Sequence, residues 1–240
     1  MKFNKDEFDR FCDILNKLSS ITPDLQIVNS NILQLGADTS YNINVDMSGL
    51  IKDQINFGIT NLGTKFPILK MMKNTTSDYI EIIEDNKRYI VTDGISDIEM
   101  TIPDFSALNT RYNDALKHDL SKYPKVLSID FDKTLIKKLN ESVRILGADN
   151  VEVKIKDNKA KFMITSKAKT STMNLISNID STIDNFETSI NDECFKTAIG
   201  DEVHIDIYKK TSVVSIISIE TNLDGCYANY RQMRGAKCSI

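Results

Sequence analysis

Two aspartates separated by one residue, Asp130 and Asp132, are the residues of this sequence whose types and spacing most directly suggest chemistry. They stand at the end of an apolar run, in the stretch VLSIDFDKTLI, and Thr134 follows them. An apolar strand followed by the order D-x-D-x-T is typical of aspartate sites that transfer phosphoryl groups. The first hypothesis is therefore catalytic.

The stretch VLSIDFDKTLI resembles the first motif of the haloacid dehalogenase superfamily, phosphatases that use paired aspartates and Mg²⁺. The resemblance implies that Asp130 attacks phosphorus and that Asp132 protonates the leaving group. Further residues could complete such a site, with the last of them as late acidic metal ligands: Thr165, Lys196, Gly200-Asp201 and Asp206.

The elements that must position these aspartates favour a different function. The apolar residues after the motif recur at near-turn spacing and predict an amphipathic helix that Gly147 ends: Leu135, Leu139, Val143 and Leu146. Alternating strands on both sides of Asp157-Asn158 then predict a hairpin with one buried face. The phosphatase fold requires strands and helices that alternate around a parallel sheet, so the phosphatase is kept only as the alternative.

The same order of elements opens the chain. One helical stripe is predicted from Phe8 to Leu18, and a hairpin follows around Asn29-Ser30-Asn31. Phe8 aligns with Leu135 at an offset of 127 positions, and Thr39-Ser40 aligns with Thr170-Ser171 at an offset of 131. Internal similarity of this kind predicts a duplicated structural unit.

The remaining pattern predicts an α+β protein of two similar domains. Each half carries two helices and many antiparallel strands. The polar stretch after Pro103 predicts a linker, which gives an N-terminal domain 1–103, a linker 104–124 and a C-terminal domain 125–240. Four details complete the expectation: a short helix capped by Thr64 with Pro67 in its first turn, its counterpart at 192–199, a surface loop at 180–191, and a loose tail at 234–240.

Composition bounds the function. The 240 residues are 41% hydrophobic and 27% charged with a net charge of −4, which argues against a protein that coats nucleic acid with its whole surface. The four cysteines form no CxxC pair and the two histidines stand apart, so we expect free thiols and no metal site. We find no signal peptide and no apolar run long enough to span a bilayer.

Two such halves joined by a linker resemble the DNA sliding clamps, the processivity factors of replicative polymerases. The likeness is closest to the two-domain clamps, and the lysine-rich, compact form looks most like those of tailed phages. The segments that carry it are FDRFCDILNKL, INFGITNLGTKFPILKMM, YIEIIEDNKRYIVTDGISDIEMTIPD, FDKTLIKKLNESVRILG and EVHIDIYKKTSVVSIISIETNLDGCYANY.

The resemblance implies a ring without enzymatic activity. Three copies would close head to tail, with sheets outside and helices lining a hole that holds duplex DNA independently of sequence. A DNA polymerase tethered to the ring would stay near the primer end, and a separate clamp loader would be needed because the sequence has no ATP-binding loop. No cofactor and no membrane are expected, and the location would be the cytoplasm, that of an infected bacterium if the chain is phage-encoded.

The resemblance also implies which residues meet DNA and partners. Cations on the polar helix faces would contact phosphates: Lys65, Lys70, Lys73, Lys133, Lys137, Lys138 and Arg144. The first helix departs from this expectation, because its cations alternate with aspartates. An apolar pocket near the linker would hold partner peptides, with a lining matched by position only: Tyr41, Leu108, Tyr112 and Tyr230.

Overall fold

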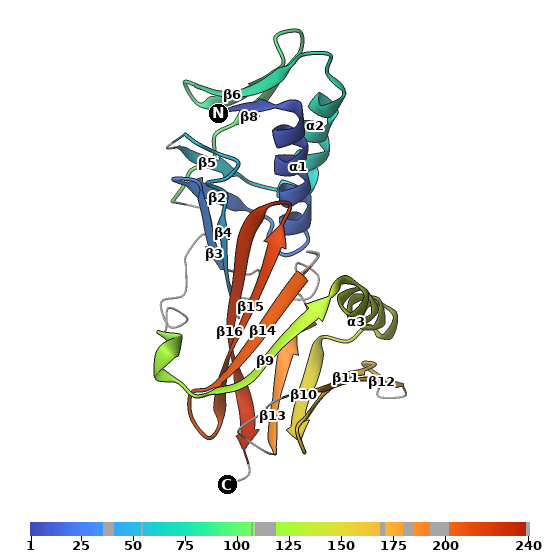
Figure 1. Cartoon of the computed structure of the whole chain (residues 1–240). Coiled ribbons are helices and arrows are strands. Elements are labelled where there is room, and N and C mark those ends of the chain that lie inside the picture. The colour runs from blue at the N-terminus through green and yellow to red at the C-terminus, as the bar shows by residue number, and fades with distance from the viewer. Residues whose placement is uncertain are drawn as a thin grey trace. The chain divides into compact units, whose positions relative to one another are not determined.

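The computed structural model describes residues 1–35, 41–53, 55–106, 108, 119–168, 171–179, 185–192 and 202–238. Its chain forms two compact units, Met1–Thr39 with Ile43–Tyr112 and Leu223–Tyr227, and Ser40–Asn42 with Asn113–Asn222 and Ala228–Ile240. Every strand pair whose register the structure describes is antiparallel, as expected for the α+β class (Figure 1).

The first unit begins with strand β1 (Lys2–Asn4) and helix α1 (Lys5–Ser19). The Asn4 side chain accepts a hydrogen bond from the Glu7 amide, and the Glu7 carboxylate accepts one from the Asn4 amide. This reciprocal capping box fixes the start of the helix. The predicted apolar stripe is buried throughout, including Phe8, Phe11 and Leu15. The sequence prediction of this helix is confirmed.

Two antiparallel sheets complete the first unit. One has the order β1-β6-β7-β8, with β6 at Tyr79–Asp85, β7 at Arg88–Thr92 and β8 at Asp97–Thr101. The other has the order β4-β3-β2-β5, with β2 at Leu25–Val28, β3 at Asn31–Leu35, β4 at Tyr41–Asp46 and β5 at Asn56–Ile59. Their register places alternate apolar side chains in the core, as the period-two patterns predicted.

Helix α2 (Leu62–Lys70) packs beside α1 and continues into the 3₁₀ turn η1 (Met71–Asn74). The expected cap at Thr64 is wrong, because the helix begins two residues earlier, after Asn61 in the left-handed conformation at φ 52°. Pro67 consequently lies inside the helix and not in its first turn. Asn tolerates the left-handed region better than most residues, and this signal was available in the sequence.

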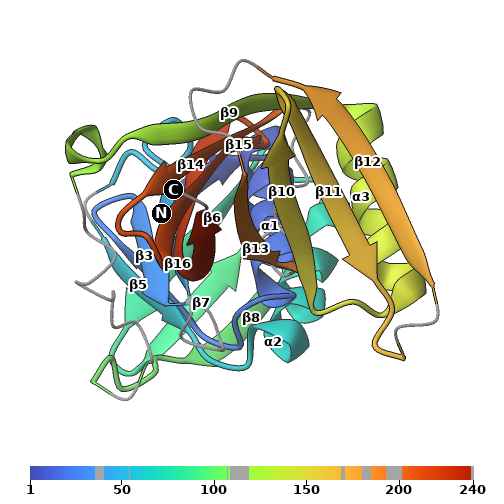
Figure 2. The same ribbon diagram turned by 90° about the horizontal axis from the view of Figure 1, so that it is seen from below.

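The described part of the second unit repeats the order of strand, helix and hairpin that opens the first. Strand β9 (Lys125–Asp132), after the 3₁₀ turn η3 (Leu120–Lys122), leads into α3 (Lys133–Leu146). The helix packs on β9, β11, β12 and β14, and Figure 2 shows it lying across β11 and β12. One sheet has the order β12-β11-β10-β13-β16, and the other pairs β9 with β14, β14 with β15, and β15 with β16.

The strands of the second unit have these bounds: β10 Asn150–Lys156, β11 Lys159–Thr165, β12 Thr172–Asn178, β13 Phe186–Asn191, β14 Glu202–Lys209, β15 Val214–Leu223 and β16 Cys226–Cys238. Two expectations are therefore wrong. The predicted loop at 180–191 contains β13, whose Phe186 and Ile190 are buried, and the predicted tail at 234–240 is largely part of β16. The helix expected at 192–199 lies almost wholly outside the described residues.

From the start of the first helix to the first hairpin turn, the two units align at an offset of 128 positions. The helix caps are Asn4 and Asp132, and the hairpin turns are Asn29-Ser30 and Asp157-Asn158, all four turn residues having positive φ. The offset of 127 predicted for the helices is therefore one residue short. Thr39-Ser40, half of the second predicted alignment, lies outside the described residues.

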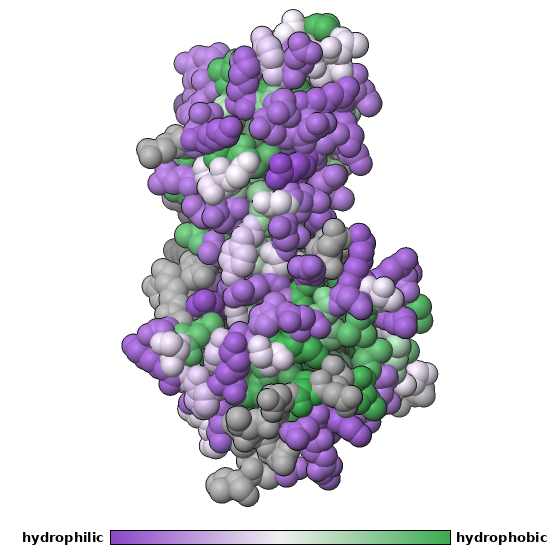
Figure 3. All heavy atoms as spheres, viewed as in Figure 1, coloured by the Kyte–Doolittle hydropathy of each residue, from purple (hydrophilic) through white to green (hydrophobic). Residues whose placement is uncertain are grey.

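The exposed surface differs between the units. In Figure 3 hydrophilic side chains dominate the visible face of the first unit, whereas hydrophobic side chains gather on that of the second. No helix of the described ranges is long and apolar enough to cross a membrane.

Candidate nucleic-acid interface

Helix α3 is held at both ends by its own sequence. The Asp132 Oδ1 atom accepts a hydrogen bond of 2.7 Å from the Leu135 amide and so caps the N-terminus. Gly147 ends the helix at φ 58°, where its amide donates to the Arg144 carbonyl. The first turn therefore starts directly at Lys133.

The buried stripe of α3 is turned relative to the prediction. Ile136, Leu139 and Val143 are buried, whereas Leu135 and Leu146 are only half-buried. Ser142 is also buried, and its hydroxyl donates to the Lys138 carbonyl one turn earlier, which satisfies it within the helix. A polar residue in the buried stripe hid the true periodicity from sequence reasoning.

The turned helix sorts its four predicted phosphate-binding cations into two groups. Lys133, Lys137 and Arg144 are exposed and lie at positions that stack along one side of the helix. Lys138 is also exposed but is rotated by about 100° from Lys137, because successive helical residues differ by that angle. The three aligned cations form what we call the α3 stripe, within which Glu141 is the nearest exposed acid.

The three predicted cations of α2 and η1 already have partners within the first unit. Lys65 Nζ lies 3.1 Å from Thr60 Oγ1, and Lys70 Nζ lies 5.9 Å from the centre of the Phe66 ring. Lys73 Nζ lies 3.0 Å from Asp9 Oδ2, and this hydrogen bond raises the pKa of Lys73. The Lys73 charge is thus partly neutralised by α1.

Two cations of α1 have a structural role that the sequence did not reveal. Arg10 Nε donates to the Asp224 carbonyl at 2.7 Å, and Lys17 Nζ lies 2.6 Å from Asp224 Oδ2. Asp224 and Gly225 form the turn between β15 and β16, which belongs to the first unit. Arg10 and Lys17 therefore hold a turn. Sequence reasoning missed this role because Arg10 and Lys17 lie more than 200 positions before Asp224, and local spacing patterns carry no information about contacts that distant.

The predicted partner pocket is only partly described. Leu108 is 5% exposed and lies where a Cβ on Gly58 would approach it to 3.1 Å, so it packs over β5 in the first unit. Tyr230 is 1% exposed in β16. Tyr112 and the side chain of Tyr41 lie outside the described residues. The pocket stays a prediction.

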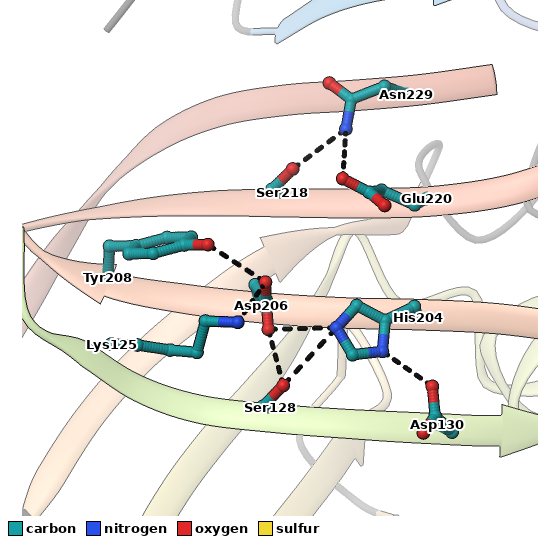
Figure 4. A network of polar contacts seen from close by, with 9 residues as sticks. All are labelled: Lys125, Ser128, Asp130, His204, Asp206, Tyr208, Ser218, Glu220 and Asn229. Carbon is teal, nitrogen blue, oxygen red and sulfur yellow. Dashed lines mark hydrogen bonds and ion pairs between the residues drawn. The ribbon is translucent and has the colours of Figure 1, made fainter. Parts of the chain in front are cut away.

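Two residues of the catalytic alternative, Asp130 and Asp206, belong to a polar network across β9 and β14 (Figure 4). His204 lies between two carboxylates, with Nδ1 2.6 Å from Asp130 Oδ1 and Nε2 3.0 Å from Asp206 Oδ1. Asp206 also accepts hydrogen bonds from Ser128 at 2.7 Å and Tyr208 at 2.9 Å, and Lys125 Nζ lies 2.7 Å from it.

Charge in this network is set by its contacts. Burial lowers the pKa of His204, but its hydrogen bonds and charge interactions with Asp130 and Asp206 outweigh this and raise the pKa overall. Burial likewise opposes ionisation of Asp206, yet hydrogen bonds from Lys125, Ser128 and Tyr208 hold the pKa of that carboxyl below its usual value. The geometry therefore favours an imidazolium between two carboxylates.

Ser128, His204 and Asp130 have the connectivity of a hydrolytic triad, since Ser128 Oγ lies 3.3 Å from His204 Nε2. They cannot act as one. An ionised Asp206 can only accept, so Nε2 must carry a proton to bond with it, and a protonated Nε2 cannot remove the proton of Ser128. Ser128 donates that proton to Asp206 instead.

The phosphatase alternative is also wrong for structural reasons. Asp130 lies on an antiparallel strand with 88% of its side chain exposed, and Asp132 is engaged as a helix cap. The required parallel sheet is replaced by antiparallel pairing of β9 with β14. Among the residues that the structure describes, no cluster of three potential metal ligands exists, while Lys196, Gly200 and Asp201 lie outside them.

No protein-family model matches the sequence, and no curated protein is similar to it. Solved structures are similar over nearly the whole chain. A PCNA2–PCNA3 complex from Sulfolobus tokodaii matches with a TM-score of 0.64 and 17% identity, covering 98% of each chain. A. fulgidus PCNA, solved with the C-terminal region of FEN-1, matches with a TM-score of 0.64 and 13% identity, covering 100% of this chain and 98% of that one.

A eukaryotic structure gives the same result. The Proliferating Cellular Nuclear Antigen of Entamoeba histolytica matches with a TM-score of 0.64 and 11% identity, covering 97% of each chain. Each match covers both units of the chain. The chain therefore has the two-domain fold of the DNA sliding clamps to which PCNA belongs.

Proposed function

We propose that this protein is a DNA sliding clamp without enzymatic activity. In this function three copies close head to tail into a ring around duplex DNA, and the ring tethers a polymerase to its template. The whole-length likeness to PCNA structures supports the fold on which the proposal rests. The observation that carries it to this chain is the α3 stripe, because its cations are exposed and lie along one side of a helix capped at both ends.

The α3 stripe suits a ring that slides. The stripe consists of Lys133, Lys137 and Arg144. Their positive charges attract DNA phosphates, and phosphate contacts do not depend on the base sequence. Positioning by the Asp132 cap and the Gly147 terminus keeps the three cations on one side of the helix. Lys138 and the partnered Lys65, Lys70 and Lys73 add charge with weaker alignment.

A sheet edge that no other strand pairs with, among the residues that the structure describes, supports ring formation. Strand β12 ends its sheet, and its seven residues, TMNLISN, include no charge and no proline. Natural proteins usually protect such edges, because unpaired backbone groups recruit further strands. Ile176 of this strand is 64% exposed. We propose that a strand from the next copy covers β12, with β8, the terminal strand of its sheet in the first unit, as the candidate.

A topological experiment tests the proposal. Purified protein is incubated with linear duplex DNA whose ends are free during loading and are then blocked by streptavidin, or with the same duplex blocked at both ends beforehand. A closed ring threads only over a free end, so retention is expected on the first substrate alone. Equal retention on both would refute encirclement, whatever the affinity.

The α3 stripe is tested in the same assay with Lys133→Glu, Lys137→Glu and Arg144→Glu combined. Retention on free-ended DNA is expected to fall, and the slope of log affinity against log salt to lose about 0.9 per phosphate contact removed. The charge-matched control combines Lys52→Glu, Lys87→Glu and Lys167→Glu, all at exposed positions. Equal loss in both variants would show that net charge and not the stripe is responsible.

Sedimentation velocity tests the ring itself. A mass approaching three times 27.1 kDa with rising concentration is expected for a homotrimer. A strict monomer at every concentration contradicts it.

The same proposal covers partners and location. We propose a DNA polymerase and a clamp loader as partners, a peptide site at Tyr41, Leu108, Tyr112 and Tyr230, and domain boundaries at 1–103, 104–124 and 125–240. We also propose a cytoplasmic location, in an infected bacterium if the chain comes from a phage. Crosslinking of a photoreactive group at position 108 to a purified polymerase is the measurement that checks the peptide site.

A further inference from the structure

Four lysines occupy one face of the β10–β11 hairpin. Lys154 and Lys161 are direct partners across the two strands, and so are Lys156 and Lys159. The residues between them, such as Val153 and Phe162, are buried, so the four lysines share the outward face. Like charges directly opposite each other destabilise a sheet, which makes this arrangement costly to the fold.

The first unit shows that the fold does not require these lysines. Its β2–β3 hairpin has the same kind of turn, with Asn29 and Ser30 at positive φ as Asp157 and Asn158 are in the second. At an offset of 128 the four lysines correspond to uncharged residues: Gln26, Val28, Asn31 and Leu33. The two hairpins therefore share a backbone design and differ in the chemistry of the outward face.

Little nearby charge compensates for the lysines. Glu187 of β13 lies 3.1 Å from Lys154 Nζ, and it is the ion-pair partner that the structure describes for this face of the hairpin. The acids within the hairpin itself are Glu152 and the turn residue Asp157. A positive face therefore stands on a chain whose net charge is −4.

A hollow adjoins the lysines. It has a volume of about 440 Å³ and is lined by Lys154, Glu152, Glu187, Thr188, Ser189, Gly235 and Ala236. Its walls come from β10, β13 and β16, all in the second unit. The surface thus combines a row of cations with a recess that can receive a side chain.

We propose that this face of the β10–β11 hairpin binds an acidic, extended peptide segment of a partner protein. Lysines on one strand are about 7 Å apart, since two residues of a strand rise by that distance. Alternate side chains of an extended peptide have the same spacing, so glutamates at every second position match both lysine pairs. A side chain next to the acidic run would enter the hollow.

Features of the site favour a peptide over duplex DNA. The cations are confined to the turn end of one hairpin, and the carboxylates of Glu152 and Glu187 lie beside them, where they would repel a continuous phosphate backbone. A phosphate backbone also has no side group that would fill the recess. An acidic peptide avoids both problems because its charges are spaced and can end where the carboxylates begin.

The probe is a fluorescein-labelled peptide with glutamate at every second position and serine between, titrated with the full chain and followed by anisotropy. Changing all four lysines to glutamine is expected to weaken binding by about fifteenfold, since each of the four exposed ion pairs contributes a factor of about two. Changing all four to arginine keeps the charge and is expected to preserve binding. Added salt should weaken binding to the wild type and have little effect on the glutamine variant.

Matched measurements decide between occupants. The glutamine variant is expected to keep wild-type sedimentation and wild-type retention on free-ended duplex DNA, which also shows that it is folded. Unchanged peptide affinity in this variant would overturn the proposal. So would a selective loss of DNA retention, which would reassign the face to nucleic acid, or a loss of association, which would reassign it to a second copy. The titration needs neither DNA nor a ring, so its failure leaves the proposed function untouched.

Discussion

Helices α1 and α3 are built to one plan and differ in what they expose. Both begin at a capped residue, Asn4 or Asp132, and both bury apolar side chains at matching positions, such as Phe8 with Ile136 and Leu15 with Val143. The outward positions diverge. Where α3 carries Lys133, Lys137 and Arg144, the first helix carries Lys5, Asp9 and Asn16.

The helix side about 100° away, which carries the next residue along, differs between α1 and α3 as well. Arg10 and Lys17 of α1 hold the Asp224 turn, while the matching residues of α3 are Lys138 and the exposed Ile145. The duplicated unit thus keeps its caps and buried positions and changes its solvent positions. Caps and core determine the fold, and the outward residues are where the two copies differ in charge.

The largest effect is expected from giving α3 the outward residues of α1. The double variant Lys137→Asp, Arg144→Asn reproduces the α1 pattern. Position 133 needs no change, because it and its counterpart, position 5, are both lysine. Affinity for free-ended duplex DNA at low salt is expected to fall on the order of a hundredfold, because two phosphate-facing cations are lost and one anion is added. Binding measured across salt concentrations checks this.

The reverse exchange controls the comparison. Asp9→Lys with Asn16→Arg gives α1 the α3 pattern and releases Lys73 from its ion pair with Asp9. The free energy of unfolding should change by less than about 1 kcal/mol in the α3 variant, because Lys137 and Arg144 are exposed, and by more in the α1 variant, because Asp9 is half-buried and paired with Lys73. An α3 variant that binds DNA like the wild type would show that the stripe faces away from DNA.

The edge strands offer the next largest effect. Strand β8 carries Asp97 and Glu99, whereas β12 carries no charge. Ile176→Lys places a charge on β12 and is expected to weaken trimer formation by about tenfold, by the mechanism that natural edges use against pairing. Sedimentation equilibrium measures it. Ile95→Lys, at a position 74% exposed in the first unit, should leave association unchanged.

The caps should contribute equally. Asn4→Ala and Asp132→Ala are each expected to lower the free energy of unfolding by about 1 kcal/mol, measured in urea. Asp132→Asn should be near neutral, because Asn caps as well as Asp and because the change removes a like-charge pair with Glu202, its partner across the strands. A severe loss in the Asn variant would indicate a further role for this carboxylate.

The smallest expected effect is a difference in the pH dependence of stability between two ion pairs that stand at corresponding positions of the two units. Lys2 opposes Glu81 in the first unit, and Asp130 opposes His204 in the second, with Lys2 and Asp130 at the offset of 128. Because the pKa of His204 is raised, its contribution is complete below about pH 6.5 and is lost as pH rises through the folded-state pKa. His204→Gln is expected to cost about 0.5 kcal/mol at pH 6 and less at pH 9.

Lys2→Gln is the contrast. The pKa of Lys2 is raised by its hydrogen bond with Glu81 and lies above 10.5, so its contribution should stay constant between pH 6 and pH 9. Denaturation of both variants at several pH values checks the pair. A pH-independent difference for His204→Gln would mean that the imidazolium is not formed.

Sequence reasoning reached the fold because its signals are local. The α1 stripe, the Gly147 terminus and the Asp157-Asn158 turn each follow from residue type and spacing, and the structure confirms them. It failed where a local rule was broken. Ser142 in a buried position shifted the α3 stripe by one residue, and polar residues around Phe186 and Ile190 disguised β13 as a loop.

The site was harder to predict than the fold, because its residues depend on distant partners. The sequence shows Lys73 as a cation without a neighbouring acid, yet Asp9 of α1 pairs with it and partly neutralises its charge. The motif D-x-D-x-T predicted catalysis, whereas Asp130 binds a histidine on another strand and Asp132 caps a helix. The lysine pairs of β10–β11 become visible only when the strand register is known.

The uncharged edge of β12 affects the solubility of the dissociated protein. A short segment with strand-forming residues, no net charge and no proline is the composition that stacks into cross-β aggregates when it is left unpaired. In the proposed ring every such edge is covered, so dilution below the association threshold would release an aggregation-prone species. Ring assembly would then protect the protein from aggregation by covering the β12 edge. When the ring dissociates, the protein would lose solubility before its subunits unfold.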